Sequence, residues 1–159
     1  MEKRTIKSEI DVCRKDELDV QEQQLVDKAI EATGRAYAAY SHFKVGAALL
    51  LANGETVLGC NQENAAYPVT ICAERSALFS AGAQYPDQPV VSIAIAARDE
   101  SGRLLGEPIT PCGSCRQAII ETERRYRRKV KILLYGTEHI YRIDGIGQLM
   151  PLSFTDEMM

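Results

Sequence analysis

Long apolar stretches are missing from this 159-residue chain, which contains no run of 18 or more apolar residues of the kind that spans a membrane. A leader in which basic residues precede an apolar segment is missing as well. We therefore expect neither membrane insertion nor secretion, and predict a cytoplasmic protein. Internal repeats and low-complexity tracts are also absent, and a chain of this length can bury a substantial core in one domain.

Positive charge is not in excess, because 19 Lys and Arg oppose 22 Asp and Glu and leave a formal net charge of −3. A mildly acidic chain is a poor general partner for polyanions, so broad nucleic-acid binding is not expected. One basic run occupies residues 124–129, after a predicted helix. We interpret it as a solvated helix end, favoured by the helix dipole, rather than as a nucleic-acid patch.

Cysteine is too sparse for a small disulfide-stabilised scaffold, since the chain has five. This usage suggests a reducing compartment. Three of the five lie in two short motifs, which leaves Cys13 and Cys60 as predicted free thiols. Histidine is scarcer still. His42 and His139 both lie outside the cysteine motifs, so neither is expected to bind a metal.

The two cysteine motifs carry the strongest chemical signal in the sequence. One is Thr-Ile-Cys-Ala-Glu-Arg from residue 70, and the other is Pro-Cys-Gly-Ser-Cys-Arg-Gln from residue 111. Each is typical of the start of a helix, and Cys112 and Cys115 lie one turn apart, so their sulfurs face the same side. Helix N-termini lower thiol pKa values and favour thiolate, the form that binds zinc. We therefore predict one zinc ion per chain, held by Cys72, Cys112 and Cys115.

Three protein ligands leave the fourth zinc position for water, which distinguishes a catalytic site from a closed structural one. Glu74 is predicted to lie beside the metal, to take a proton from that water and to deliver it to the substrate. Three thiolates around a dication give a net charge of about −1, so a nearby cation would restore the balance. Arg75 is the candidate, as a hydrogen-bond donor to the sulfurs.

A second group of candidate site residues follows a predicted strand. Alternate residues of an extended chain point the same way, so the amide of Asn61 and the carboxylate of Glu63 are expected side by side. Such a pair suits the hydroxyls of a sugar. The alternative interpretation of Asn61 is a turn-capping amide, and the alternative interpretation of Phe43 is a core aromatic.

Cys-Ala-Glu followed by Pro-Cys-Gly-Ser-Cys-Arg-Gln resembles the zinc-dependent cytidine deaminase superfamily. Residues 40–49, 59–67 and 149–154 are similar to the substrate-side and C-terminal segments of the small nucleoside cytidine deaminases. The resemblance implies hydrolytic deamination of cytidine and 2′-deoxycytidine to uridine products and ammonia, as in pyrimidine salvage. It assigns Asn61 and Glu63 to the ribose and Phe43 to the pyrimidine ring. A carboxylate beside the 3′-hydroxyl would repel a phosphate, so a free nucleoside is the expected substrate.

The same resemblance implies a homotetramer in which neighbouring subunits share active sites, with Tyr67 and Phe154 at the matching positions. Ala73 and Gln117 lie within the two cysteine motifs. Ala73 is expected to contact the substrate, and Gln117 is expected to support the metal site together with Arg75.

Periodicity and turn signals predict an α/β domain. Helices are expected at residues 20–39, 72–83 and 112–124, and strands at 45–52, 55–61, 90–97, 130–135 and 140–143, with a hairpin at Asn53-Gly54 and a helical turn capped by Asp144. This order implies a three-layer α/β/α sandwich, which the resemblance sharpens to a five-stranded mixed sheet.

We predict a catalytic domain over residues 20–159, preceded by an N-terminal extension over residues 1–19. Within the extension, Ile6, Ile10 and Val12 indicate a short strand, although their alternation is broken. A loosely ordered arm and an arm that wraps a partner subunit are both compatible with its composition.

Three other functions share parts of the zinc motif. A polynucleotide or tRNA base deaminase is disfavoured by the pair formed by Asn61 and Glu63 and by the acidic charge. A deaminase of a cytosine nucleoside antibiotic is disfavoured by the same pair. A structural zinc-binding interaction domain would need a fourth protein ligand, and none stands at a suitable spacing.

Overall fold

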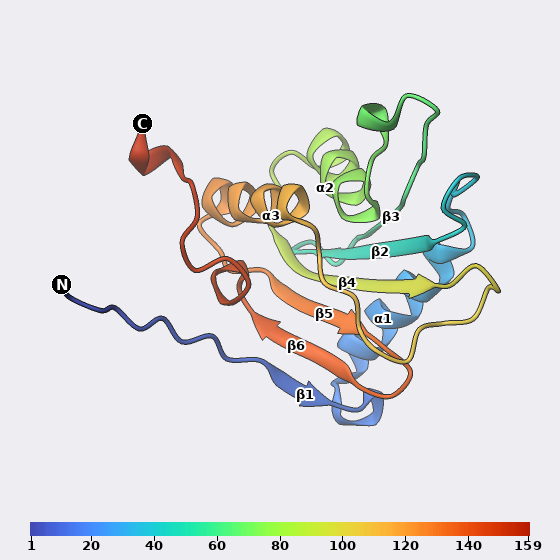
Figure 1. Cartoon of the computed structure of the whole chain (residues 1–159), viewed down its shortest axis with the longest axis horizontal. Coiled ribbons are helices and arrows are strands. Elements are labelled where there is room, and N and C mark those ends of the chain that lie inside the picture. The colour runs from blue at the N-terminus through green and yellow to red at the C-terminus, as the bar shows by residue number, and fades with distance from the viewer.

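The structure is a computed structural model that describes residues 1–159 (Figure 1). Its elements in chain order are β1 (Asp11–Cys13), α1 (Val20–Thr33), β2 (Lys44–Leu51), β3 (Thr56–Cys60), α2 (Ala73–Gln84), β4 (Val90–Arg98), α3 (Gly113–Tyr126), β5 (Lys131–Tyr135) and β6 (Ile140–Asp144). The strands form one sheet in the order β1-β6-β5-β4-β2-β3. Only β4 and β5 pair in parallel, so the sheet is mixed, as predicted. None of the helices combines the length and the hydropathy needed to cross a bilayer.

Helices cover both faces of the sheet, with α1 on one side and α2 and α3 on the other (Figure 1). Successive side chains of a strand point to opposite faces, and the two cores follow this alternation. Leu49 and Ile95 belong to the core beneath α2 and α3, whereas Leu50 and Ala94 belong to the core beneath α1. The predicted three-layer α/β/α arrangement is therefore confirmed.

The sheet has six strands, and the prediction of five is wrong. The additional strand is β1, which pairs antiparallel with β6 in the register Val12↔Tyr141. It is only three residues long, and Ile6 and Ile10 lie outside it. So short a segment with broken alternation gives little sequence signal, because its pairing depends on partners far away in the chain. The division of the chain at residue 19 stays a prediction.

Helix α1 ends earlier than predicted, at Thr33 rather than at residue 39. Gly34 forms its C-cap. The chain then turns, so that Tyr37 pairs with Gln62, which follows β3. Tyr37, which the helical pattern included, is therefore placed beside the segment that holds the candidate sugar-binding residues.

The remaining predicted helices and strands are confirmed to within about two residues at each end. Gly54 in the β2–β3 hairpin has φ +87°, as the Asn-Gly signal requires. The prediction that Asp144 caps a helical turn is wrong. The 3₁₀ turn Ile146–Gln148 has Gly145 at its N-cap, and Asp144 forms an ion pair with Lys129 instead.

Glycine at position 59 lets α2 lie directly against β3. A Cβ atom there would be 2.4 Å from the carbonyl oxygen of Ala73 and 2.5 Å from the amide nitrogen of Ala77. Only a residue without a side chain permits this approach. The first turn of α2, which begins just after Cys72, is therefore positioned by the sheet.

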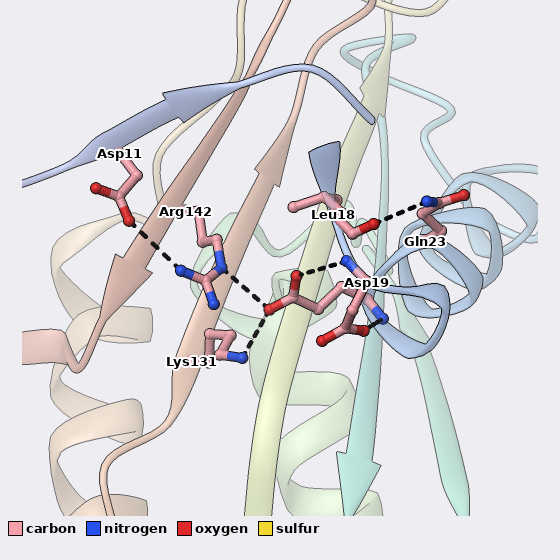
Figure 2. A network of polar contacts seen from close by, with 7 residues as sticks. Asp11, Leu18, Asp19, Gln23, Lys131 and Arg142 are labelled. Atoms are coloured by element: carbon pink, nitrogen blue, oxygen red, sulfur yellow. Dashed lines mark hydrogen bonds and ion pairs between the residues drawn. The ribbon is translucent and has the colours of Figure 1, made fainter. Parts of the chain in front are cut away.

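A buried carboxylate ties α1 to the far strands of the sheet. Glu22 is 6% exposed and accepts hydrogen bonds from Lys131 Nζ at 2.6 Å and Arg142 Nε at 3.1 Å. Arg142 also reaches Asp11 of β1, so one guanidinium connects three segments (Figure 2). Burial by itself would raise the pKa of Glu22, but the hydrogen bonds from Lys131 and Arg142 lower it below its ordinary value.

Glu22→Gln is expected to lower the free energy of unfolding by about 2 kcal/mol at pH 7, because a buried charge-assisted hydrogen-bond network is lost. A carboxyl group whose folded pKa is depressed stabilises the fold above its unfolded pKa of 4.5, and this contribution disappears as the pH falls through the lower folded pKa. Urea unfolding of both proteins at pH 7 and at pH 4 should therefore show a smaller difference at pH 4. The exposed Glu100→Gln provides the control, and a difference independent of pH would contradict this assignment.

Candidate active site

Three cysteine sulfurs converge where α2 and α3 begin. Cys72 Sγ lies 3.8 Å from Cys112 Sγ, and Cys112 Sγ lies 3.5 Å from Cys115 Sγ. All three sulfurs lie within 4.8 Å of one another, and no fourth His, Cys, Asp or Glu joins this group. Thiolate sulfur is a preferred zinc ligand, and a set of three leaves one tetrahedral position open. The donors present therefore fit zinc.

The local sequence explains why the sulfurs meet. Cys72 is the N-cap of α2, Cys112 is the N-cap of α3, and Cys115 lies in the first turn of α3. Two helix N-termini thus direct their partial positive charge at the cluster. A hydrogen bond from Cys115, with further contributions from Arg75 and Cys112, lowers the pKa of Cys72 to about 5. The same contact with Cys72, together with burial, raises the pKa of Cys115, so one thiolate is favoured even before a metal binds.

Glu74 lies in the first turn of α2, two residues after Cys72, and is 4% exposed. Burial raises the pKa of its carboxyl, and the negative charge on Cys72 acts in the same direction. A carboxyl with a raised pKa is suited to both accepting and donating a proton near neutral pH. Glu74 can therefore act as a proton carrier beside the sulfurs.

Arg75 brings positive charge to the cysteine cluster. Its Nη2 atom lies 4.0 Å from Cys72 Sγ, at the outer limit of a hydrogen bond to sulfur. The contacts with Cys72 and Cys115 raise the pKa of the guanidinium. Arg75 is thus placed to offset the negative charge of the thiolates, as the sequence led us to expect.

Arg75→Ala is expected to weaken zinc affinity by about 10–100-fold, the usual effect of removing a group that supports a ligand. The thiol pKa of Cys72 in the zinc-free protein should rise, because Arg75 favours the thiolate. Competition with a chromogenic chelator measures the affinity, and the pH dependence of thiol alkylation measures the pKa. Arg103→Ala, which removes a side chain that is 81% exposed, is the matched control. Unchanged zinc retention in Arg75→Ala would exclude this role.

The candidate sugar-binding segment is attached to the cysteine cluster through the backbone. Gln62 and Ile71 exchange two backbone hydrogen bonds, and Ile71 immediately precedes Cys72. On its other side, the segment pairs with Tyr37 through Asn61 and Glu63. Residues 61–63 are therefore held between two chain segments, next to the first cysteine.

Asn61 is buried, and its side chain is engaged by the backbone. Its Oδ1 accepts a hydrogen bond from Val45 N at 2.8 Å, and its Nδ2 donates one to Phe43 O at 2.9 Å. Phe43 is half-buried and immediately precedes β2. The amide thus fixes the turn before β2, which is the alternative role named for it above. Contact of Asn61 or Phe43 with a substrate stays a prediction.

Glu63 is half-buried and borders a hollow of about 420 Å³, which is lined by Tyr40, Ser41, Glu63, Tyr67 and Thr70. Hydrogen bonds from the Ser41 hydroxyl and from the Tyr40 amide lower the pKa of its carboxyl. The rings of Tyr40 and Tyr67 meet edge to face, with centroids 6.1 Å apart. The structure thus brings Glu63 and Tyr67 together at one depression.

The other predicted site residues lie around α2 and α3. Ala73 is fully buried at the first position of α2. Gln117, two residues after Cys115, donates from Nε2 to the carbonyl oxygen of Phe154 at 3.0 Å. The Phe154 side chain is 57% exposed. A direct contact of Gln117 with the sulfurs is not observed.

Comparison with known proteins settles the family. The family model for the cytidine and deoxycytidylate deaminase zinc-binding region matches residues 19–131. The chain belongs to this family. The match includes both cysteine motifs and, with the three converging sulfurs, confirms the predicted zinc cofactor. The resemblance inferred from the motifs is confirmed as well.

Individual cytidine deaminases are similar over most of the chain. The cytidine deaminase of Halalkalibacterium halodurans is 39% identical over 137 residues, which cover 86% of this chain and 96% of that protein. The Mycobacterium tuberculosis cytidine deaminase is 36% identical over 139 residues, with 86% and 91% covered. The crystal structure of the Burkholderia pseudomallei cytidine deaminase matches with a TM-score of 0.69 and 40% identity, covering 82% of this chain and 97% of that one.

Two residues at the site were not singled out by the sequence. Arg116 donates to Pro111 O at 2.8 Å and to Leu149 O at 2.7 Å, so it braces the entry to α3. Ser41 donates to Glu63. The signal for Ser41 was its position two residues before Phe43, a spacing at which a serine hydroxyl often accepts from the backbone.

Proposed function

We propose that this chain is a hydrolase that deaminates free cytidine and 2′-deoxycytidine to uridine and 2′-deoxyuridine, with release of ammonia. The observation that carries the proposal is the meeting of three cysteine sulfurs beside the buried Glu74 at two helix starts. The relatives that are cytidine deaminases match this chain over most of its length, which supports the same reaction here.

In the proposed reaction, Cys72, Cys112 and Cys115 hold the zinc ion. When bound, zinc supplies Lewis-acid chemistry that makes a water molecule acidic enough to act as a nucleophile near neutral pH. Glu74 accepts a proton from the attacking water and donates it to N3 of the pyrimidine. The water oxygen forms a bond to C4, which leaves a hydroxyl and the amino group on the same carbon. Glu74 then accepts the proton of this hydroxyl and passes it to the amino group. The C4–N bond breaks, ammonia is released, and C4 becomes the carbonyl carbon of the uridine product. The raised pKa of Glu74 suits both transfers.

The substrate-binding part of the proposal assigns Asn61 and Glu63 to the ribose and Phe43 to the pyrimidine ring. Ala73 is assigned to the substrate site as well. The lowered pKa of Glu63 keeps its carboxylate negative at neutral pH, which favours a sugar hydroxyl and disfavours a phosphate at the same place. This charge supports a free nucleoside, rather than a nucleic acid, as substrate.

The basic run of residues 124–129 does not favour nucleic acid either. Arg124 forms ion pairs with Asp156 and Glu157 in the C-terminal segment, and Lys129 pairs with Asp144. Part of the positive charge is therefore balanced within the chain. This supports our interpretation of the run as a helix end, in a protein that we propose to act in the cytoplasm.

We also propose a homotetramer with shared active sites. A groove of about 720 Å³ between α2 and α3 has 14 lining residues, of which six are hydrophobic. They include Leu78 and the 57% exposed Phe79. Tyr67 and Phe154 are 72% and 57% exposed, and are therefore accessible to a neighbouring subunit. Sedimentation equilibrium of the purified protein tests this assembly, and a mass of about 17.6 kDa, that of one chain, would exclude it.

The activity is tested by incubating purified, zinc-loaded protein with cytidine and following ammonia release. Parallel reactions contain 2′-deoxycytidine, single-stranded DNA or a chelator in excess. We expect release from both nucleosides, none from DNA, and loss of activity with the chelator that added zinc restores. Deamination of DNA but not of cytidine would replace this proposal with the polynucleotide alternative.

A further inference from the structure

The carboxylate of Glu63 is fixed by the two residues at the start of a short turn. Tyr40 N donates to Oε2 at 2.7 Å, and Ser41 N donates to both carboxylate oxygens, at 3.2 and 3.3 Å. The Ser41 hydroxyl donates to Oε1. An ionised carboxylate has about four acceptor positions. Most of them are therefore already used, and few directions remain open for a substrate hydroxyl.

The Ser41 hydroxyl also reaches the other side of the turn. Phe43 N donates to Ser41 Oγ at 3.1 Å. Because its acceptor side is directed toward this amide, the hydroxyl has its single proton available for Glu63. His42, which lies between Ser41 and Phe43 in the sequence, has φ +57°. This left-handed conformation is unfavourable for a residue with a side chain. Hydrogen bonds at both ends stabilise this strained turn: Ser41 donates to Glu63, and Asn61 donates to the carbonyl oxygen of Phe43.

We infer that Ser41 is a positioning residue, whose hydroxyl sets the direction of the Glu63 carboxylate and of the Phe43 backbone together. One side chain thereby links the proposed sugar-binding and ring-binding groups. Ser41 and Glu63 both line the same hollow, which agrees with a role at the substrate rather than in the core. The inference rests on the proposed function, because it concerns recognition of the nucleoside.

The test measures kcat and KM for cytidine and for 3′-deoxycytidine, which lacks the hydroxyl assigned to Glu63. Ser41→Ala should raise KM for cytidine about tenfold, the effect of one lost hydrogen bond to a charged group. Its kcat and zinc content should stay at the wild-type level, because the cysteine cluster and Glu74 are untouched. With 3′-deoxycytidine the effect of Ser41→Ala on KM should be smaller, because Glu63 then has no sugar hydroxyl to bind and only the contribution through Phe43 is lost.

Two further variants separate positioning from a merely structural role. Ser41→Thr retains the hydroxyl and should restore KM to within about threefold of wild type. Ser101→Ala removes a hydroxyl that donates to Asp99 at 2.6 Å in an exposed turn, and should leave KM unchanged.

Equal losses for Ser41→Ala on both nucleosides, or failure of Ser41→Thr to restore KM, would overturn the inference while the proposed function stands. A zinc-loaded wild-type protein without activity on cytidine would overturn the proposed function, and this inference with it.

Discussion

Glu74→Gln is expected to lower kcat for cytidine by about 10²–10⁴-fold, the usual contribution of a positioned general acid–base group. Glutamine has nearly the same shape, so it fits a position that is 4% exposed, but it can neither accept nor release the proton that the reaction moves. Zinc content should remain at the wild-type level, because the group of converging ligand atoms contains only the three sulfurs. Steady-state rates and metal analysis of the same preparation measure both quantities.

Glu74→Ala should behave in the same way, and the exposed Glu55→Gln should match wild type. Binding offers a second check on Glu74→Gln. Since the substrate-binding groups are intact, the variant should still bind cytidine, as calorimetry would show. A variant that turned over at the wild-type rate would remove Glu74 from the reaction, and one that lost zinc would give it a structural role instead.

Cys115→Ala is expected to abolish stable zinc binding and, with it, deamination. Cys115 is fully buried, and its sulfur lies 3.5 Å from that of Cys112. Removing a residue that only supports a ligand weakens metal binding by about 10–100-fold, so loss of a ligand should weaken it by more than about 100-fold. The variant should also lose the stabilisation that the metal gives the native state, about 4 kcal/mol at a free zinc concentration a thousand times the dissociation constant.

Thermal unfolding with and without a chelator tests the second part of this prediction. The chelator should lower the Tm of the wild type and leave that of Cys115→Ala nearly unchanged. Cys13→Ala, which removes a thiol on β1 outside the cluster, should keep both zinc and activity. Full zinc occupancy in Cys115→Ala would show that the other sulfurs suffice.

The metal-binding residues were easier to predict from the sequence than the long-range contacts that position them. The spacing of Cys112 and Cys115 within one helical turn, and the placement of Cys72 at a helix start, depend on local geometry alone, and local geometry can be inferred from residue order. The three layers follow from the order of helices and strands along the chain, which turn signals and helical periodicity make visible.

Long-range pairings could not be inferred in this way. Strand β1 is specified by its contacts with β6 and by the link from Asp11 to Arg142, which are separated in sequence by 131 positions. The hydrogen bond from the Asn61 side chain to the backbone of Phe43 likewise joins residues 18 positions apart. Neither pairing leaves a periodic pattern, so each becomes visible only when the chain is folded.

The placement of the sulfurs at the starts of two separate helices affects the order in which the chain folds and binds its metal. Cys72 and Cys112 are 40 positions apart and become neighbours only after α2 and α3 have docked on a core of 18 buried residues. Such a core holds its shape by hydrophobic burial and does not depend on an ion, unlike the small zinc domains that are unfolded without metal. We therefore expect the polypeptide to fold before it takes up its metal, into a site that the two docked helices have already formed.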